Sequence, residues 1–109
     1  MIMFTDEHIA MILAGQKTQT RRIWKKPRAV VGSVHQVKEK MFGPRLTEIY
    51  IHAVHKEHLL DITGEDAYHE GGYSREEFLK KWFEINPKSP SNPEIYAVTF
   101  ELVQSMRVG

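Results

Sequence analysis

The alternating residues from Ile95 to Leu102 constrain the fold most. Tyr96, Val98, Phe100 and Leu102 would lie on one face of a strand, and Ile95, Ala97, Thr99 and Glu101 on the other. A period of two is typical of β-structure. We therefore expect a strand close to the C-terminus.

Two further strands are expected earlier in the chain. Glu48 to Val54 would place Ile49, Ile51 and Ala53 on one side and Tyr50, His52 and Val54 on the other. Both sides carry apolar residues, so we expect a central position in the sheet. Ser33 to Lys38 is a weaker strand signal, because neither of its faces is cleanly apolar.

Three helices are also expected. Thr5 is a suitable N-cap for a first helix that buries Ile9, Ile12 and Leu13 and ends at Gly15. Capping boxes beginning at Thr63 and Ser74 predict a short helix ending at Gly71–Gly72 and then a longer one. The longer helix carries an aromatic stripe whose spacing favours the core over a base-stacking platform: Phe78, Trp82 and Phe83.

Separated strands with helices before and between them predict an α+β domain, its small sheet curled into a β-barrel with the helices packed on the outside. The 109 residues, 41% of them hydrophobic and 27% charged, suit a single domain over residues 1–109. The sequence lacks cysteine, which excludes disulfides and thiolate zinc sites. We expect no metal and no cofactor. We also expect no membrane segment and a cytoplasmic location, because the sequence has no apolar run of transmembrane length and no leader, with polar and acidic residues already at Thr5, Asp6 and Glu7.

The most informative charged segment runs from Lys17 to Arg28. It holds six cations and no Asp or Glu, in a chain of net charge +1: Lys17, Arg21, Arg22, Lys25, Lys26 and Arg28. Thr18 and Thr20 add hydroxyl groups, so the segment suits a phosphate-bearing partner or a polar nucleoside. By contrast, Asp61 to Asn86 contains seven acidic and three basic residues. A solvated charged edge without a ligand is the alternative.

Three aromatic positions leave two interpretations open. Trp24 lies among cations, where it would either stack on an unpaired base or fill the core. Tyr68 and Tyr73 flank Glu70 and would either form a cleft wall or belong to a turn without a ligand.

The order of these motifs resembles the ASCH domain family, whose fold is similar to the PUA domains of RNA-modifying enzymes. The resemblance spans about residues 3 to 103 and is carried by the Gly-x-Lys-Thr-x-Thr-x-Arg core after the first helix, by Val31-Gly32-Ser33-Val34, by the segment from Asp61 to Ala67, and by Tyr96-Ala97-Val98-Thr99-Phe100. In this chain the core reads Gly15, Lys17, Thr18, Thr20 and Arg22.

The resemblance implies a β-barrel with a cleft lined by the basic segment, and a role in RNA binding, RNA metabolism or coactivation. One branch of the family removes the acetyl group from N4-acetylcytidine with a Lys, a Thr and a Glu. Those residues correspond here to Lys17, Thr20 and Glu70. Amide hydrolysis needs a nucleophile and a base, so Thr20 would attack, Lys17 would take its proton, and Glu70 would orient Lys17 or relay a proton.

Two interpretations of this set remain open. The cations Arg21 and Arg22 would lower the pKa of Lys17 and favour a neutral amine, whereas a plain Lys17–Glu70 ion pair would only close the cleft or hold a base edge. Trp24, Lys25 and Lys26 make the segment more basic than a small nucleoside needs, which favours RNA.

The leading hypothesis is therefore an RNA-binding ASCH protein. The residues expected to contact RNA are Lys17, Thr18, Arg21, Arg22, Trp24, Lys25, Lys26 and Arg28. The alternative is an N4-acetylcytidine amidohydrolase with catalytic Lys17, Thr20 and Glu70. A third possibility is a protein-interaction module whose basic and acidic halves meet a partner.

Overall fold

The computed structural model describes residues 1–40, 43–44 and 46–103. Its strands are β1 (Ile2–Met3), β2 (Gln19–Arg22), β3 (Val34–Lys38), β4 (Thr47–His58) and β5 (Glu94–Leu102). Its helices are α1 (Asp6–Leu13), α2 (Gly64–Gly71) and α3 (Arg75–Ile85), with a 3-10 turn, η1, at Leu59–Asp61. Within the described residues no helix has the length and apolar character needed to cross a bilayer.

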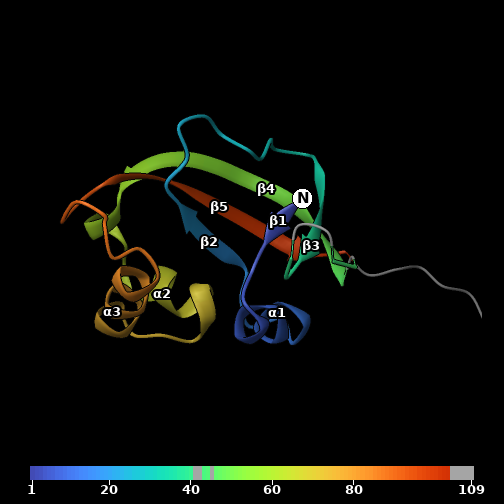
Figure 1. Ribbon diagram of the computed structural model, residues 1–109, viewed down its shortest axis with the longest axis horizontal. Coiled ribbons are helices and arrows are strands. Elements are labelled where there is room, and N and C mark those ends of the chain that lie inside the picture. The colour runs from blue at the N-terminus through green and yellow to red at the C-terminus, as the bar shows by residue number, and fades with distance from the viewer. Residues whose placement is uncertain (41–42, 45, 104–109) are drawn as a thin grey trace, which may run out of the picture.

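The strands form one curled sheet in the order β1-β3-β4-β5-β2. β1 pairs with β3 in parallel, and the other neighbouring strands are antiparallel. In Figure 1 the three helices lie below the sheet and residues 23–33 form an arch above it. α1 packs with one hydrophobic cluster, whereas α2 and α3 pack with another. This arrangement confirms the predicted α+β class, although the sheet is an open half-barrel with β1 and β2 at its edges.

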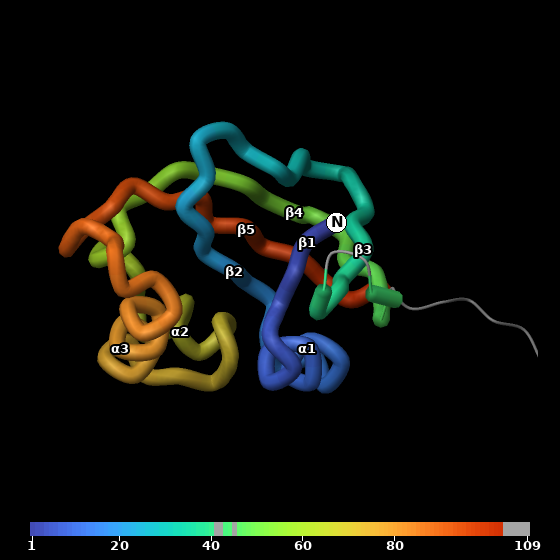
Figure 2. The backbone as a smooth tube through the Cα atoms, viewed as in Figure 1, coloured from blue at the N-terminus to red at the C-terminus, as the bar shows by residue number. Residues whose placement is uncertain are grey.

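A side chain links the two edges of this half-barrel. The guanidinium of Arg22, on β2, donates from Nη2 to the main-chain oxygen of Met3, on β1, at 2.9 Å. The chain passes from β1 directly into α1, and the arch of residues 23–33 returns it from β2 to β3 (Figure 2). α1 and the arch therefore lie next to these two edge strands.

β4 is central, as predicted, but a bulge changes which of its residues face the core. Ile51 lies opposite Phe100, whereas Ala53 lies opposite Thr99, so one extra residue is accommodated between Ile51 and Ala53. An inserted residue reverses the facing of those that follow. Val54 consequently pairs with the buried Val98, and the prediction that Ala53 shares a side with Ile51 is wrong.

Two hydrophobic clusters cover the two faces of β5. The first contains ten buried residues: Ile2, Phe4, Ile9, Ile12, Ala29, Val37, Ile49, Ile51, Val98 and Phe100. The second contains seven: Leu59, Ile62, Ala67, Phe78, Trp82, Ile95 and Ala97. Because Val98 and Phe100 belong to one cluster and Ile95 and Ala97 to the other, β5 is buried on both sides.

α1 begins and ends where the sequence indicates. The Thr5 hydroxyl accepts from the amide of His8 at 3.3 Å, and Gly15 adopts a left-handed conformation with φ 76°. Leu13, however, is exposed, so its predicted burial is wrong. The buried stripe of this eight-residue helix is centred on Ile9 and Ile12, and Leu13 lies on one flank of it while His8 and Met11 are only partly exposed.

Candidate functional site

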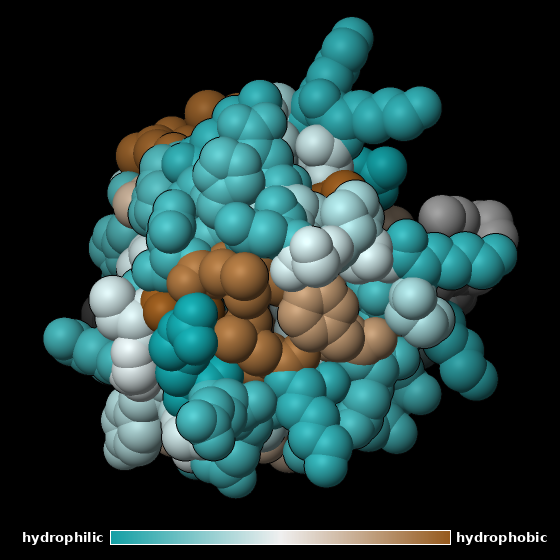
Figure 3. Space-filling model, turned by 90° about the vertical axis from the view of Figure 1, so that its left-hand side faces the viewer, coloured by the Kyte–Doolittle hydropathy of each residue, from teal (hydrophilic) through white to brown (hydrophobic). Residues whose placement is uncertain are grey.

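An open cleft of about 730 Å³ lies where the gap between β1 and β2 meets α3. It is lined by residues of four chain segments: Met3, Phe4, Thr5, Asp6 and His8 from β1 and α1; Lys17, Thr20, Arg21, Arg22, Ile23, Trp24 and Arg28 from residues 17–28; Glu39 just after β3; and Glu70, Tyr73, Phe78, Lys81, Trp82, Ile85 and Asn86 from α2, α3 and the residues beside them. Apolar surface gathers in a hollow on one side of the molecule, framed by hydrophilic residues (Figure 3).

Lys17 and Glu70 meet at the wall of this cleft. Lys17 Nζ donates to Glu70 Oε1 at 2.9 Å and to the Glu70 main-chain oxygen at 2.8 Å. The two residues are only 3% and 2% exposed. The backbone prepares this contact, because the amides of Gln16 and Lys17 both donate to Met11 O and the amide of Thr18 donates to His69 O.

The glycines at the end of α2 allow this close approach. Thr63 caps the helix by accepting from the Asp66 amide at 3.0 Å, and Glu70 lies in its last turn. Gly72 then adopts φ 80°, a conformation that favours glycine. A Cβ there would collide with the Gln16 side chain, and one at Gly71 would meet the sulfur of Met11 at 2.7 Å. The glycine pair thus brings Glu70 against the segment that carries Lys17.

Arg21 shares Glu70 with Lys17. Its Nη1 donates to Glu70 Oε2 at 2.8 Å, and its Nε donates to Glu57 Oε1 at 2.8 Å. Asp66 completes the set, 3.3 Å from Nη2. Arg21 is 4% exposed, and its donors are already occupied by carboxylates and Gln19. Arg21 is therefore nearly covered and paired with carboxylates, because residues of the acidic half of the chain fold onto it.

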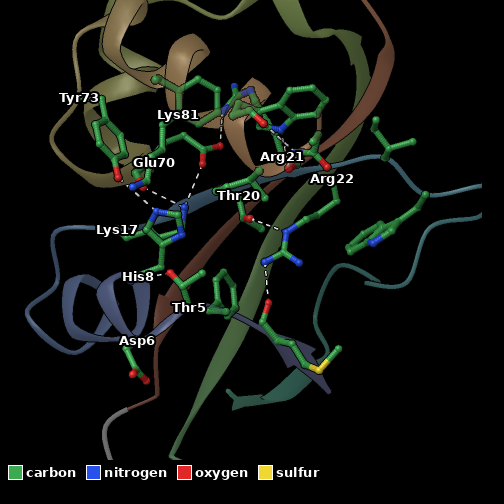
Figure 4. Close-up of a pocket in the computed structure, with 18 of the residues that line it drawn as sticks. Thr5, Asp6, His8, Lys17, Thr20, Arg21, Arg22, Glu70, Tyr73 and Lys81 are labelled. Atoms are coloured by element: carbon green, nitrogen blue, oxygen red, sulfur yellow. Dashed lines mark hydrogen bonds and ion pairs between the residues drawn. The ribbon is translucent and has the colours of Figure 1, made fainter. Parts of the chain in front are cut away.

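Arg22 differs from Arg21 in having no carboxylate partner among the described residues. Its Nε donates to Thr20 Oγ1 at 3.0 Å and its Nη2 to Met3 O, while its plane covers the Phe4 ring at 4.7 Å. Within the described chain Nη1 has no hydrogen-bond partner, and no buried side-chain nitrogen or oxygen is left unpaired. Nη1 therefore borders the open cleft beside Thr20 (Figure 4).

The surroundings lower the pKa of Lys17. Burial is the largest cause, and the charges of Arg22 and Arg21 act in the same direction, whereas Glu70 raises the pKa through its charge and its hydrogen bond. The sequence-based expectation named the two arginines; the structure adds desolvation as the larger cause. Lys17 is thus both ion-paired with Glu70 and lowered in pKa, so each of the two interpretations left open by the sequence has a counterpart in the structure.

The remaining residues of the predicted RNA-contacting set lie in different environments. Lys25, Lys26 and Arg28 are exposed on the arch, and Arg28 also borders the cleft. Thr18 is partly buried. Trp24 packs against the first hydrophobic cluster and lies 6.0 Å from the Tyr96 ring, yet it also lines the cleft. Both interpretations of Trp24 thus have a counterpart in the structure.

On the opposite wall, Tyr73 lines the cleft and Tyr68 does not. The Tyr73 hydroxyl lies 3.2 Å from Nε2 of His8, a residue that the sequence reading did not single out. Burial and the positive charge of Lys17 lower the pKa of His8 to about 4. His8 and Tyr73 are 65 positions apart in the chain, so no local sequence pattern predicts their contact. No cluster of potential metal ligands occurs in the described part of the chain.

Several solved structures share this architecture. The chain is similar to the ASCH domain from Lactobacillus crispatus JV V101, with a TM-score of 0.68 and 17% identity over 87% of this chain and 69% of that one. The chain has the fold of an ASCH domain. It is also similar to protein EF3133 of Enterococcus faecalis V583, assigned to the family model DUF984, with a TM-score of 0.67 and 16% identity over 93% and 74% of the two chains.

A third similar structure is a mutant of the ASCH protein ZmASCH from Zymomonas mobilis. The TM-score is 0.63 and the identity 17%, covering 92% of this chain and 66% of that one. No family model and no curated protein sequence matches the chain. The likeness at these identities concerns the ASCH fold, and the chemistry of the cleft must be argued from this chain's own residues.

Proposed function

We propose that the cleft binds an N4-acylated cytidine and hydrolyses its amide bond, with N4-acetylcytidine as the substrate to be tested. The observation that carries the proposal is the buried Lys17–Glu70 pair, assembled from residues 53 positions apart, in a cleft that Thr20 also lines. The volume of about 730 Å³ lies within the range of small-molecule sites, roughly 300–1,000 Å³. The resemblance to the amidohydrolase branch of ASCH proteins supports the same residues.

Proton transfer within the Lys17–Glu70 pair would prepare the nucleophile. Movement of one proton from Nζ to Glu70 Oε1, which lie 2.9 Å apart, leaves an amine that accepts the Thr20 hydroxyl proton. Burial favours this step, because it disfavours separate charges and lowers the pKa of Lys17. Thr20 Oγ1 then attacks the acyl carbon.

Arg22 is suited to stabilise the charge that develops. Its Nη1, which has no hydrogen-bond partner within the described residues, borders the cleft next to the Thr20 hydroxyl bound by Nε. A fixed cationic donor at that point would bind the oxyanion of the tetrahedral intermediate. When this intermediate collapses, the bond between the acyl carbon and N4 breaks, and N4 of the departing cytidine takes the proton from Lys17. An acyl ester remains on Thr20. The aromatic residues Trp24 and Tyr73 offer ring faces for the base.

The test is release of cytidine from N4-acetylcytidine, followed by chromatography. Lys17→Met keeps the apolar length of the side chain and removes the amine, and Thr20→Val keeps the shape and removes the hydroxyl. Each is expected to lower kcat by at least ~100-fold, whereas Thr20→Ser should retain part of the activity. Lys26→Met, on the exposed arch, is the matched control. Absence of release by the wild-type protein, or full activity of Lys17→Met, would refute the proposal.

A second candidate, binding of single-stranded RNA, is favoured by the exposed cations of the arch. Lys25, Lys26 and Arg28 are exposed and Arg28 borders the cleft, so a strand could cross the arch with one base in the cleft. Replacing all three by alanine should reduce the slope of log K against log salt concentration by about 2, at ~0.7 per phosphate contact. Filter binding to a short unstructured RNA measures this slope, and salt-independent binding would contradict it.

A further inference from the structure

His8 occupies a defined position at the cleft that the proposed mechanism has not used. It comes from the first turns of α1, and its Nε2 lies 3.2 Å from the Tyr73 hydroxyl, on the connection between α2 and α3. The two rings meet edge to face, with centroids 6.4 Å apart and planes at 77°. Both residues line the cleft, so the imidazole is held from the side opposite β2.

The second ring nitrogen of His8 is directed at the open cleft. Nδ1 has no hydrogen-bond partner among the described residues, and because no buried side-chain nitrogen is left unpaired it must border open space. Figure 4 shows the ring beside Lys17 and facing the part of the cleft that contains Thr20. When Nε2–H donates to Tyr73 Oη, the lone pair of Nδ1 faces that space.

The charges around His8 keep the imidazole neutral. Burial and the cations Lys17, Arg22 and Lys81 lower its pKa to about 4, against a smaller opposing effect of Glu7. Burial also raises the pKa of Tyr73, so its hydroxyl remains protonated. At neutral pH both side chains are therefore uncharged, and His8 can accept a proton.

Resting on the proposed function, we infer that His8 is the general base that activates water for hydrolysis of the acyl-Thr20 ester, and that Tyr73 orients it. Other groups at the cleft are less suited. Glu70 is already bound to Lys17 and Arg21 through both oxygens, and the arginines cannot accept a proton. Asp6 lies toward the rim, away from Thr20 (Figure 4).

The step balances as follows. His8 Nδ1 takes one proton from water while the hydroxide oxygen forms a bond to the acyl carbon. The bond from that carbon to Thr20 Oγ1 then breaks, and Oγ1 regains a proton from the Lys17–Glu70 pair. The carboxylic acid leaves and loses its proton to solvent, and His8 returns its proton to the pair.

The experiment compares acylation and deacylation in His8→Gln with N4-acetylcytidine as substrate. We expect one cytidine per enzyme to be released rapidly, followed by a steady-state rate at least ~100-fold below wild type. Intact-mass spectrometry should show the enzyme heavier by one acetyl group, on the peptide containing Thr20, and added imidazole should restore turnover. Tyr73→Phe should slow deacylation less than His8→Gln. His52→Gln, on the exposed part of β4, is the control.

The outcomes separate the two proposals. Wild-type turnover with no acetyl-enzyme in His8→Gln, or an unchanged steady-state rate in that variant, would overturn the role of His8 and leave the amidohydrolase intact. No cytidine release by the wild-type protein would overturn the amidohydrolase itself and this step with it. A thermal melt of His8→Gln shows whether the variant is folded, and imidazole rescue answers the question independently of any moderate loss of stability.

Discussion

Glu70→Gln is expected to destabilise the protein strongly, because one buried carboxylate serves two buried cations. Glu70 Oε1 accepts from Lys17 and Oε2 accepts from Arg21. The amide of glutamine keeps one acceptor but turns an NH₂ group toward a cationic donor. Hydrogen bonds to charged groups contribute roughly 1.5–3 kcal/mol each, and removing one partner of a buried ion pair costs about 3–5 kcal/mol. We therefore expect a loss of about 3–5 kcal/mol.

Urea unfolding followed by circular dichroism and tryptophan fluorescence measures this loss. A native domain has roughly 5–15 kcal/mol of unfolding free energy, and 1 kcal/mol corresponds to roughly 4 °C in Tm for a chain of this size. The expected decrease in Tm is thus about 12 °C or more. Glu65→Gln is the matched control, since this carboxylate lies on the same helix with its side chain 85% exposed, and it should change stability by less than about 0.5 kcal/mol.

A double variant tests the cause of the loss. Combining Glu70→Gln with Lys17→Met removes the unpaired cation, while Arg21 retains Glu57 and Asp66. The double variant should therefore lose less free energy than the sum of the two single variants. A Glu70→Gln protein within about 1 kcal/mol of wild type, or strictly additive losses, would show that Glu70 is not the shared counterion described here.

Two further predictions concern neighbouring positions. Stability should fall as the pH decreases from 6.5 toward about 4, because the folded-state pKa of His8 is about 4 and its unfolded value is about 6.5, so the unfolded chain binds the proton first. Discounted for partial solvent contact, the loss of unfolding free energy is on the order of 1–2 kcal/mol. His8→Asn should remove this part of the pH dependence in urea titrations. Gly72→Ala should cost about 1–2 kcal/mol of unfolding free energy, because φ is 80° there. Gly64→Ala, with nothing within 4 Å of the added carbon, should be close to neutral. Equal effects of the two substitutions on Tm would contradict the conformational argument.

Local patterns predicted the three helices and three of the five strands that the structure describes, but not β1 or β2. The helix caps at Thr5, Thr63 and Ser74, the left-handed Gly15 and the alternating strand from Ile95 depend on neighbouring residues, and neighbours are visible in a sequence. The bulge after Ile51 was not predicted, because it depends on the register between β4 and β5.

The candidate site was predicted in part. Lys17, Thr20 and Glu70 came from the resemblance, and the structure places all three at one cleft. The partners of Arg21 and the contact between His8 and Tyr73 were missed. Each joins residues far apart in the chain, 36 positions for Arg21 and Glu57 and 65 for His8 and Tyr73, and no periodicity connects such positions.

The sequence by itself determined where the charges are and which segments become helices and strands, since both follow from residue types and their local spacing. Only the tertiary structure decided what the charges do. Folding brings the acidic segment of α2 onto the basic segment, which buries Lys17 and Arg21 against Glu70 and leaves Lys25, Lys26 and Arg28 exposed. The reason is physical: a cation removed from water requires a counterion, and which cation is removed depends on the packing of α2 against β2.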